Sequence, residues 1–293
     1  MTSKICYYYQ TFVGLQPLLE NPQLVDIILV SSIHFGTNKD GSPYIHLNDA
    51  PPTDNIFNTL WDETNILSNK GVKIMLMLGG AGGAYNSLFN NFSLYYPMLV
   101  NTIKTHNWIT GIDLDIEEYV DLNNVKYLIN ILKKDFGNDF SITMAPIQSA
   151  LMADGPGLGG FSYKELFNSP EGKLISHFNV QCYSSYTLDA INKIIQNGYP
   201  EDKIVMGMLG GNYDPDYWAD KIKQVKLIKL KYNIGGVFCW EYCNSPPDMN
   251  DPSKWAEDMA RILKANILKY YFLLGEYYTE SFMGKLNFPF CYI

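Results

Sequence analysis

The sequence predicts an α/β fold in which eight parallel strands and their helices close into a (β/α)8 TIM barrel. Short apolar runs rich in β-branched and aromatic residues alternate with longer amphipathic stretches, which is typical of a parallel sheet covered by helices. These runs number eight, and eight strand-helix units in about 250 residues is the size of such a barrel. The 293-residue length and 47% hydrophobic content supply enough apolar material for one large core.

The expected strands occupy residues 4–9, 26–35, 72–78, 111–117, 141–146, 177–183, 204–209 and 235–240. The expected helices occupy residues 54–69, 93–105, 122–136, 163–175, 188–196, 217–230 and 252–268. Two of these helices end at Gly71 and Gly137, and glycine is the usual residue just after a helix C-terminus. The segment 36–47, with its Asp40-Gly41 pair, predicts a β-hairpin after the second strand.

A doubly wound open sheet is the alternative topology. The glycine-rich stretch 78–84 resembles a dinucleotide-binding G-x-G-x-x-G motif only loosely, follows the third strand and lacks an acid placed for a ribose. Only about 25 residues separate the seventh and eighth strands, which leaves no room for an inserted α+β domain. We therefore expect one barrel over residues 1–268 and an aromatic-rich C-terminal extension over residues 269–293.

Composition narrows the possible partners. A net charge of -8 without a basic run argues against nucleic-acid binding, which needs clustered Lys and Arg. The N-terminus lacks the apolar core of a secretory signal, and no apolar stretch reaches the ~20 residues that span a bilayer, so we expect a cytoplasmic monomer without a membrane partner. Cys239 and Cys243 lack a second ligand pair and a nearby His, and we expect neither a metal nor a cofactor.

The segment 111–117, GIDLDIE, places three acids on alternate positions of an apolar strand. Alternation puts Asp113, Asp115 and Glu117 on one face, and in a barrel the apolar face must meet the helices, so the acids point inward. A solvated face of an open sheet is the alternative interpretation. Carboxylates about 6.6 Å apart in a low-dielectric interior cannot all ionise cheaply, so at least one should hold a proton at neutral pH.

Glu117 is the expected proton donor among the three acids. It stands last on the strand, and the C-terminal ends of the strands form the active-site face in this fold. A carboxylic acid that keeps its proton near neutral pH can protonate a leaving-group oxygen, as general-acid catalysis requires.

These residues resemble glycoside hydrolase family 18, the chitinases and endo-β-N-acetylglucosaminidases. GIDLDIE is similar to the family's D-G-x-D-x-D-x-E signature and is closest to single-domain hevamine-type chitinases. Four further motifs occur in the family's order at residues 73–80 (KIMLMLGG), 144–146 (MAP), 181–183 (QCY) and 235–240 (GGVFCW). The resemblance implies a retaining glycosidase that cleaves β-1,4 bonds next to N-acetylglucosamine, in chitin or chito-oligosaccharides, with the substrate's 2-acetamido group as the nucleophile.

The resemblance also implies catalytic roles. Glu117 would protonate the glycosidic oxygen, and Asp115 would orient the acetamido group whose carbonyl oxygen attacks the anomeric carbon. Asp113 would share a proton or a hydrogen bond with Asp115. Tyr183 would hold the acetamido group, and Trp240 would form the apolar floor under the distorted sugar.

Four further residues are expected to contact substrate: Gln181, Tyr8, Gly80 and Met144. Gln181 shares the strand face of Tyr183, and Tyr8 in the first strand could reach the same cavity. Gly80 and Met144 belong to the third- and fifth-strand motifs.

Four residues at three places in the chain depart from the family pattern and keep alternative functions open. Thr110 replaces the first aspartate of the signature, Met77 replaces the third-strand serine, and Ser184-Ser185 replaces an Asn or Asp after the sixth-strand tyrosine. The first two could shift the pKa of Asp113 or slow turnover. The alternatives are a non-catalytic chito-oligosaccharide-binding or storage protein on the same barrel, and an endo-β-N-acetylglucosaminidase acting on N-glycan cores.

Overall fold

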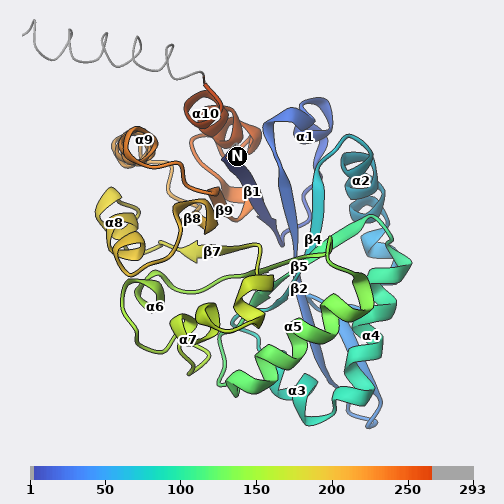
Figure 1. Cartoon of the computed structure of the whole chain (residues 1–293). Coiled ribbons are helices and arrows are strands. Elements are labelled where there is room, and N and C mark those ends of the chain that lie inside the picture. Colours follow the sequence, from blue (N-terminus) through green and yellow to red (C-terminus); the bar gives the residue numbers. More distant parts are fainter. Residues whose placement is uncertain (1–2, 266–293) are drawn as a thin grey trace, which may run out of the picture.

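The computed structural model describes residues 3–265, and in it eight parallel strands form a closed barrel (Figure 1). The barrel strands are β1 (Lys4–Tyr9), β2 (Ile27–Thr37), β4 (Lys73–Gly79), β5 (Ile109–Asp115), β6 (Ser141–Met144), β7 (His177–Gln181), β8 (Ile204–Leu209) and β9 (Gly236–Trp240). Pairing runs β1-β9-β8-β7-β6-β5-β4-β2, and β1 also pairs with β2, which closes the ring. The predicted barrel is confirmed, and the open sheet is excluded. The extension predicted for residues 269–293 lies outside the described residues.

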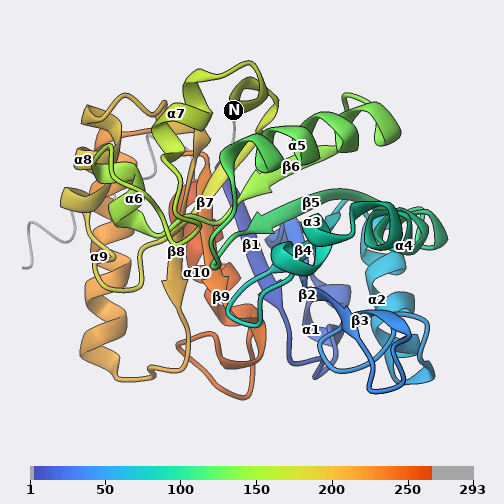
Figure 2. The same ribbon diagram turned by 90° about the horizontal axis from the view of Figure 1, so that it is seen from below.

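Helices surround the strands on the outside of the barrel (Figures 1 and 2). They are α1 (Gln16–Glu20), α2 (Asn58–Asn69), α3 (Tyr85–Asn90), α4 (Phe92–Thr105), α5 (Leu122–Phe136), α6 (Gln148–Met152), α7 (Tyr163–Asn168), α8 (Leu188–Gln196), α9 (Pro215–Lys231) and α10 (Ser253–Leu263). The segment between β8 and β9 consists of α9 and its flanking loops, so the predicted absence of an inserted domain is confirmed. Within residues 3–265, no helix is both long enough and apolar enough to cross a bilayer.

Local sequence explains where these helices begin and end. In α5, the carboxylate of Asp121 accepts a hydrogen bond from the Asn123 amide at the N-terminus, and Gly137 ends the helix with a φ of +87°. The buried side chains of α5 recur at helical spacing and face the sheet: Val125, Leu128, Ile129 and Leu132. The helix predicted over residues 163–175 is instead two pieces, because Pro170 interrupts it.

The predicted hairpin is present beside the barrel. β3 (Pro43–Leu47) pairs antiparallel with the end of β2, and Gly41 adopts a φ of +85° in the connecting turn. Figure 2 shows β3 beside β2 at the edge of the molecule, so this hairpin extends one wall beyond the barrel rim.

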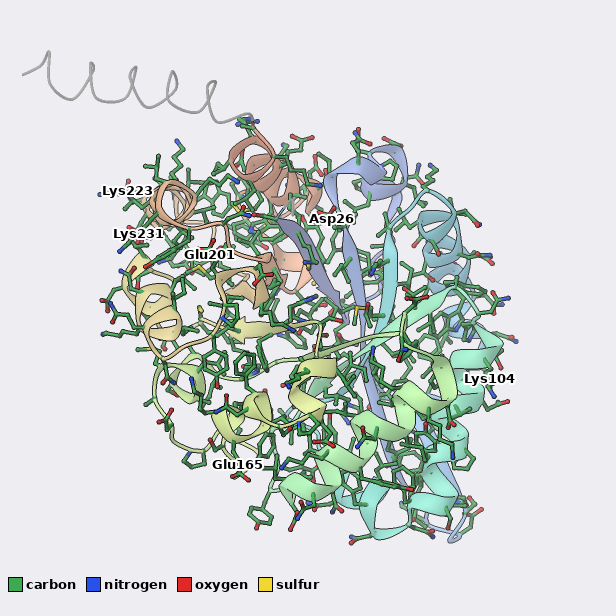
Figure 3. All side chains as sticks on the ribbon, viewed as in Figure 1. Asp26, Lys104, Glu165, Glu201, Lys223 and Lys231 are labelled. Carbon is green, nitrogen blue, oxygen red and sulfur yellow. The ribbon has the colours of Figure 1, made fainter. Side chains whose placement is uncertain are left out.

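Apolar side chains fill two separate layers. The larger cluster lies between strands and helices and includes Ile112, Leu114 and Met144. A smaller cluster fills the barrel interior: Cys6, Tyr8, Ile27, Leu29, Met75, Met77, Val205 and Phe238. Charged side chains such as Lys104 and Lys223 lie at the periphery (Figure 3). The two layers follow from strand alternation, because each strand sends successive side chains to opposite faces.

Candidate active site

The two aspartates of β5 point into the barrel, as the alternation predicted. Asp113 is fully buried and accepts hydrogen bonds from three strands: from the Tyr8 hydroxyl on β1 (2.7 Å), the Thr143 hydroxyl on β6 (2.5 Å) and the Asn179 amide on β7 (3.0 Å). Burial raises the pKa of Asp113, and these three donors partly oppose that rise because they stabilise the carboxylate. Asp113 is therefore held rigidly at the bottom of the acidic segment.

Asp115 lies one inward position higher and is 5% exposed. Burial, followed by repulsion from Glu117 and Asp113, raises the pKa of Asp115 well above its usual value. The sequence predicted that at least one of the three acids holds a proton at neutral pH, and these directions favour a proton on Asp115. A hydrogen bond from Gln181 acts against this rise, because it stabilises the ionised form.

Glu117 lies two residues beyond the end of β5, in the loop rather than in the strand, and is partly exposed. The Gln181 amide connects it to Asp115: Nε2 lies 3.1 Å from Glu117 Oε1, 3.2 Å from Asp115 Oδ1 and 2.9 Å from the Ala145 carbonyl. A single amide group thus holds both carboxylates at the mouth of the barrel.

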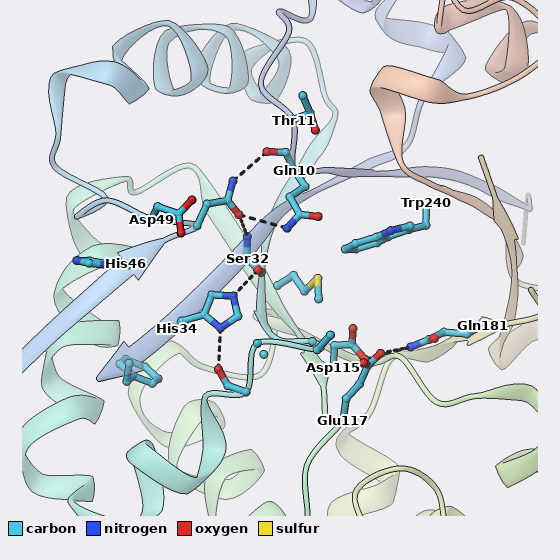
Figure 4. A pocket seen from close by; sticks show the side chains of 18 of the residues that line it. Gln10, Thr11, Ser32, His34, His46, Asp49, Asp115, Glu117, Gln181 and Trp240 are labelled. Carbon is cyan, nitrogen blue, oxygen red and sulfur yellow. Dashed lines mark hydrogen bonds between the residues drawn. The ribbon is translucent and has the colours of Figure 1, made fainter. Parts of the chain in front are cut away.

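A pocket of about 800 Å³ opens above these acids (Figure 4). Five expected site residues line it together with Gly80: Asp115, Glu117, Gln181, Tyr183 and Trp240. In Figure 4, Trp240 and Gln181 stand on one side, and His34 and His46 stand on the other. The pocket therefore extends from the barrel mouth to the β2–β3 hairpin, where the Tyr44 and His46 rings stack with centroids 4.0 Å apart.

The aromatic residues of the pocket are held in place by other rings. Trp240 packs against Tyr8 with ring centroids 5.1 Å apart, and Tyr183 meets the edge of Phe238 at 6.3 Å. Burial and the nearby Asp115 raise the pKa of Tyr183 well above its usual value, so its phenol remains a neutral hydrogen-bond donor.

Three expected site residues do not line the pocket. Asp113 and Tyr8 lie beneath it, where the Tyr8 hydroxyl bonds Asp113 and the Tyr8 ring packs against Trp240. Met144 lies fully buried in the layer between strands and helices, because its neighbour Thr143 takes the inward position on β6. The structure thus separates Met144 from the sugar contact that the motif implied.

The family departures at Thr110 and Met77 have different consequences in the structure. Thr110 is exposed, and its hydroxyl bonds the Ile74 carbonyl at 3.4 Å rather than any acid. Met77 is buried beside Gly80 and lines the pocket. The donors to Asp113 come instead from Thr143 and Asn179, so the expected dependence of Asp113 on Thr110 has no contact to support it.

Sequence reasoning also missed the residues that shape the glycine-rich loop after β4. The Glu118 carboxylate accepts hydrogen bonds from the backbone amides of Ala84 (2.5 Å) and Tyr85 (2.6 Å). His34 Nδ1 lies 2.6 Å from the Gly83 carbonyl, and the Ser32 hydroxyl lies 2.6 Å from His34 Nε2. Alternation could have identified Thr143 and Asn179, because each lies two residues before a motif residue, Ala145 or Gln181, and residues two apart on a strand share one face. No comparable pattern in the sequence indicated Glu118 or His34.

A buried and a partly exposed carboxylate at the C-terminal mouth of a (β/α)8 barrel, bridged by an amide in a pocket that a tryptophan also lines, are features of a glycosidase site. Residues 3–214 match the family model described as glycosyl hydrolases family 18. The chain belongs to this family, and the resemblance seen in its motifs is confirmed.

Solved structures and a curated relative agree with this assignment. A fungal endo-β-N-acetylglucosaminidase of family 18 is 33% identical, with a TM-score of 0.78 over 89% of this chain and 98% of that one. The chitinase ChiC of Aspergillus fumigatus is 34% identical, with a TM-score of 0.75 over 88% of this chain and 98% of that one. Chitinase 2 of Rhizopus oligosporus is 25% identical over 72% of this chain, which spans only 37% of that protein.

Proposed function

We propose that the protein is an endo-acting, retaining glycosidase that cleaves β-1,4 bonds next to N-acetylglucosamine in chitin-type oligosaccharides. The observation that carries this proposal is the Gln181 bridge, which holds Asp115 and Glu117 together in the pocket that Trp240 also lines. Similarity to a chitinase and to an endo-β-N-acetylglucosaminidase supports the same class of substrate.

The geometry favours the substrate's acetamido oxygen as the nucleophile. A retaining enzyme that uses its own nucleophile needs a second carboxylate about 5 Å away across the scissile bond. Asp115 instead is the last residue of β5, only two residues before the acid, is bound by Gln181, and has a raised pKa because it is buried. A protonated Asp115 is a poor nucleophile but a good hydrogen-bond donor to an acetamido group.

The reaction then balances with one protein acid and one water. Glu117 donates its proton to the glycosidic oxygen, the bond from the anomeric carbon to that oxygen breaks, and the acetamido carbonyl oxygen bonds to the anomeric carbon. Water then attacks the anomeric carbon from the face that the leaving group vacated, and Glu117 removes a proton from the water. The bond from the anomeric carbon to the acetamido oxygen breaks at the same time, which restores the acetamido group. Two displacements give net retention. Tyr183 would hold the acetamido oxygen, and Trp240 would support the distorted ring.

Endo cleavage is favoured by the shape of the pocket. It continues past the cleavage position to the β2–β3 hairpin, and no inserted domain between β8 and β9 covers it. A chain longer than one sugar can therefore lie along it.

The test is product analysis with chitotetraose and a glycopeptide carrying a diacetylchitobiose core, each with the wild-type protein and Glu117→Gln. We expect shorter N-acetylated products from chitotetraose, β-anomers at first, and a rate about 10²–10⁴-fold lower in Glu117→Gln. The fully deacetylated tetramer, which lacks the attacking carbonyl, should not be cleaved. Cleavage of the glycopeptide alone would identify the endo-β-N-acetylglucosaminidase instead. Tight binding without turnover of either substrate, unchanged in Glu117→Gln, would identify a binding protein.

A further inference from the structure

Glu241 is a buried acid next to the site to which no role has been given. It directly follows Trp240, is 8% exposed and has four donors. Its Oε2 accepts the backbone amides of Gln10 (2.7 Å) and Thr11 (2.8 Å), and its Oε1 accepts the Thr11 hydroxyl (2.5 Å) and the Cys243 thiol (3.3 Å). A carboxylate has about four acceptor positions, and here neutral donors from two loops fill them.

The position of this carboxylate in the barrel shows what it connects. The backbone pairing of β1 with β9 ends at Tyr7 and Cys239. Beyond that point, Trp240 is held from the other side, where its carbonyl accepts the Gly210 amide at 2.6 Å. The Glu241 side chain therefore replaces the missing backbone pairing and joins the first and last strands at their active-site ends.

Both loops joined in this way contribute walls of the pocket. Gln10 and Thr11 line it after β1, and Trp240 lines it at the end of β9 (Figure 4). The Cys243 thiol completes the cluster as a donor, because burial and the neighbouring Glu241 raise the pKa of Cys243 and keep the thiol protonated at neutral pH.

We propose that Glu241 is a positioning residue that holds Trp240 and the Gln10–Thr11 segment in register across the pocket. It does not touch the reacting atoms. This proposal deepens the function proposed above and rests on it. If Glu241 instead had only a structural role, it would support the stability of the barrel, and its loss would affect turnover independently of Trp240.

The first experiment compares Glu241→Ala with Glu241→Gln. Alanine leaves the two backbone amides without their acceptor, and we expect kcat/KM on chitotetraose to fall about 100-fold, the size of loss that a displacement of about 1 Å produces. Glutamine can still accept both amides through its oxygen and donate to the Thr11 hydroxyl, so it should stay within about threefold of wild type. If the alanine variant fails to fold, Thr11→Val removes one donor only and should lower kcat/KM about threefold to tenfold.

A double-mutant cycle tests whether Glu241 acts through Trp240. We expect Glu241→Ala to cost little further kcat/KM once Trp240→Ala is present, because residues that act through one another are not additive. Additive losses, or a fall in thermal stability with unchanged kinetics in Glu241→Ala, would overturn the proposal.

Binding separates this proposal from the proposed function. In a Glu117→Gln background, chitotetraose Kd measured by calorimetry should rise about tenfold on adding Glu241→Ala, one tenfold step in affinity. If the wild type hydrolyses neither substrate, the proposed function fails, and the binding arm still reports on Glu241. If the wild type is active and Glu241→Ala matches it in kcat/KM and Kd, only the positioning role fails.

Discussion

Replacing Thr143 by valine removes one hydrogen bond from the buried Asp113, together with the longer one of 3.4 Å that the Thr143 hydroxyl accepts from the Asn179 amide. The Thr143 hydroxyl lies 2.5 Å from Asp113 Oδ1, and both side chains are fully buried. Because valine has nearly the same shape, the substitution leaves no large cavity. A hydrogen bond to an ionised group contributes about 1.5–3 kcal/mol, and the added apolar methyl returns roughly 0.8 kcal/mol. We expect a net loss of about 1–2 kcal/mol in the free energy of unfolding when Asp113 is ionised.

The loss of unfolding free energy in Thr143→Val should depend on pH, and the pKa of Asp113 decides whether it grows or shrinks as pH rises. Burial raises that pKa in the folded state, and the Thr143 hydrogen bond partly lowers it again. Without the hydroxyl the folded pKa rises further. A group with a raised folded pKa stabilises the fold below its unfolded pKa, and this contribution is lost as pH rises through the folded pKa. The variant should therefore differ little from wild type at pH 4 and most at pH 8.

Urea denaturation at pH 4, 6 and 8 measures this difference, and Thr110→Val is the matched control. Thr110 is exposed and bonds only the Ile74 carbonyl at 3.4 Å, so its replacement should change neither stability nor kcat/KM measurably. A penalty in Thr143→Val that is equal at every pH, or larger at pH 4, would refute the reasoning. Loss of activity in Thr110→Val would show that this position does support the acids.

Two further substitutions, the second with a matched control, test Asp115 and the end of β4. Asp115→Asn removes a buried acid whose raised pKa lowers the stability of the wild type as pH rises, so the variant should be more stable relative to wild type at pH 8 than at pH 4. Its hydrolysis rate should fall about 10²–10⁴-fold. If the urea midpoints of the variant and the wild type depend on pH in the same way, this would count against the raised pKa of Asp115. Gly79 has a φ of +97°, and a Cβ there would stand 2.3 Å from the Asp115 carbonyl oxygen, so Gly79→Ala should cost about 1–3 kcal/mol. Gly137 has a similar φ of +87° but open space around it, so Gly137→Ala should lower the melting temperature less than Gly79→Ala does. Equal losses in the two variants would show that the contact between the Cβ at position 79 and the Asp115 carbonyl oxygen contributes nothing.

The periodic pattern of the sequence predicted most of the fold. Eight strands, the hairpin after the second strand and the main helices follow from apolar periodicity and glycine or proline signals, which act over a few neighbouring residues. The same local rule placed Asp113 and Asp115 on the inward face. The strand predicted over residues 111–117 extends two residues too far, because the last paired residue of β5 is Asp115. Where pairing ends depends on the neighbouring strand, which a local rule does not include.

The candidate site was only partly predictable. Asp115, Glu117, Gln181, Tyr183 and Trp240 line one pocket, as the motifs implied. Met144 does not, because its strand places Thr143 inward instead. Thr110 makes no contact with the acids for a related reason: by alternation it lies on the face of Ile112 and Leu114, and its hydroxyl bonds the Ile74 carbonyl.

The sequence by itself determined the class of fold, the family and the residues able to carry the chemistry, because alternation, helix caps and motifs are properties of short segments. Only the tertiary structure decided which distant groups meet. Closure of the barrel brings Tyr8, Thr143 and Asn179 from three strands onto Asp113, and it brings Glu241 onto the loop after β1. Such contacts depend on the tilt and stagger of the closed barrel, which no single segment encodes.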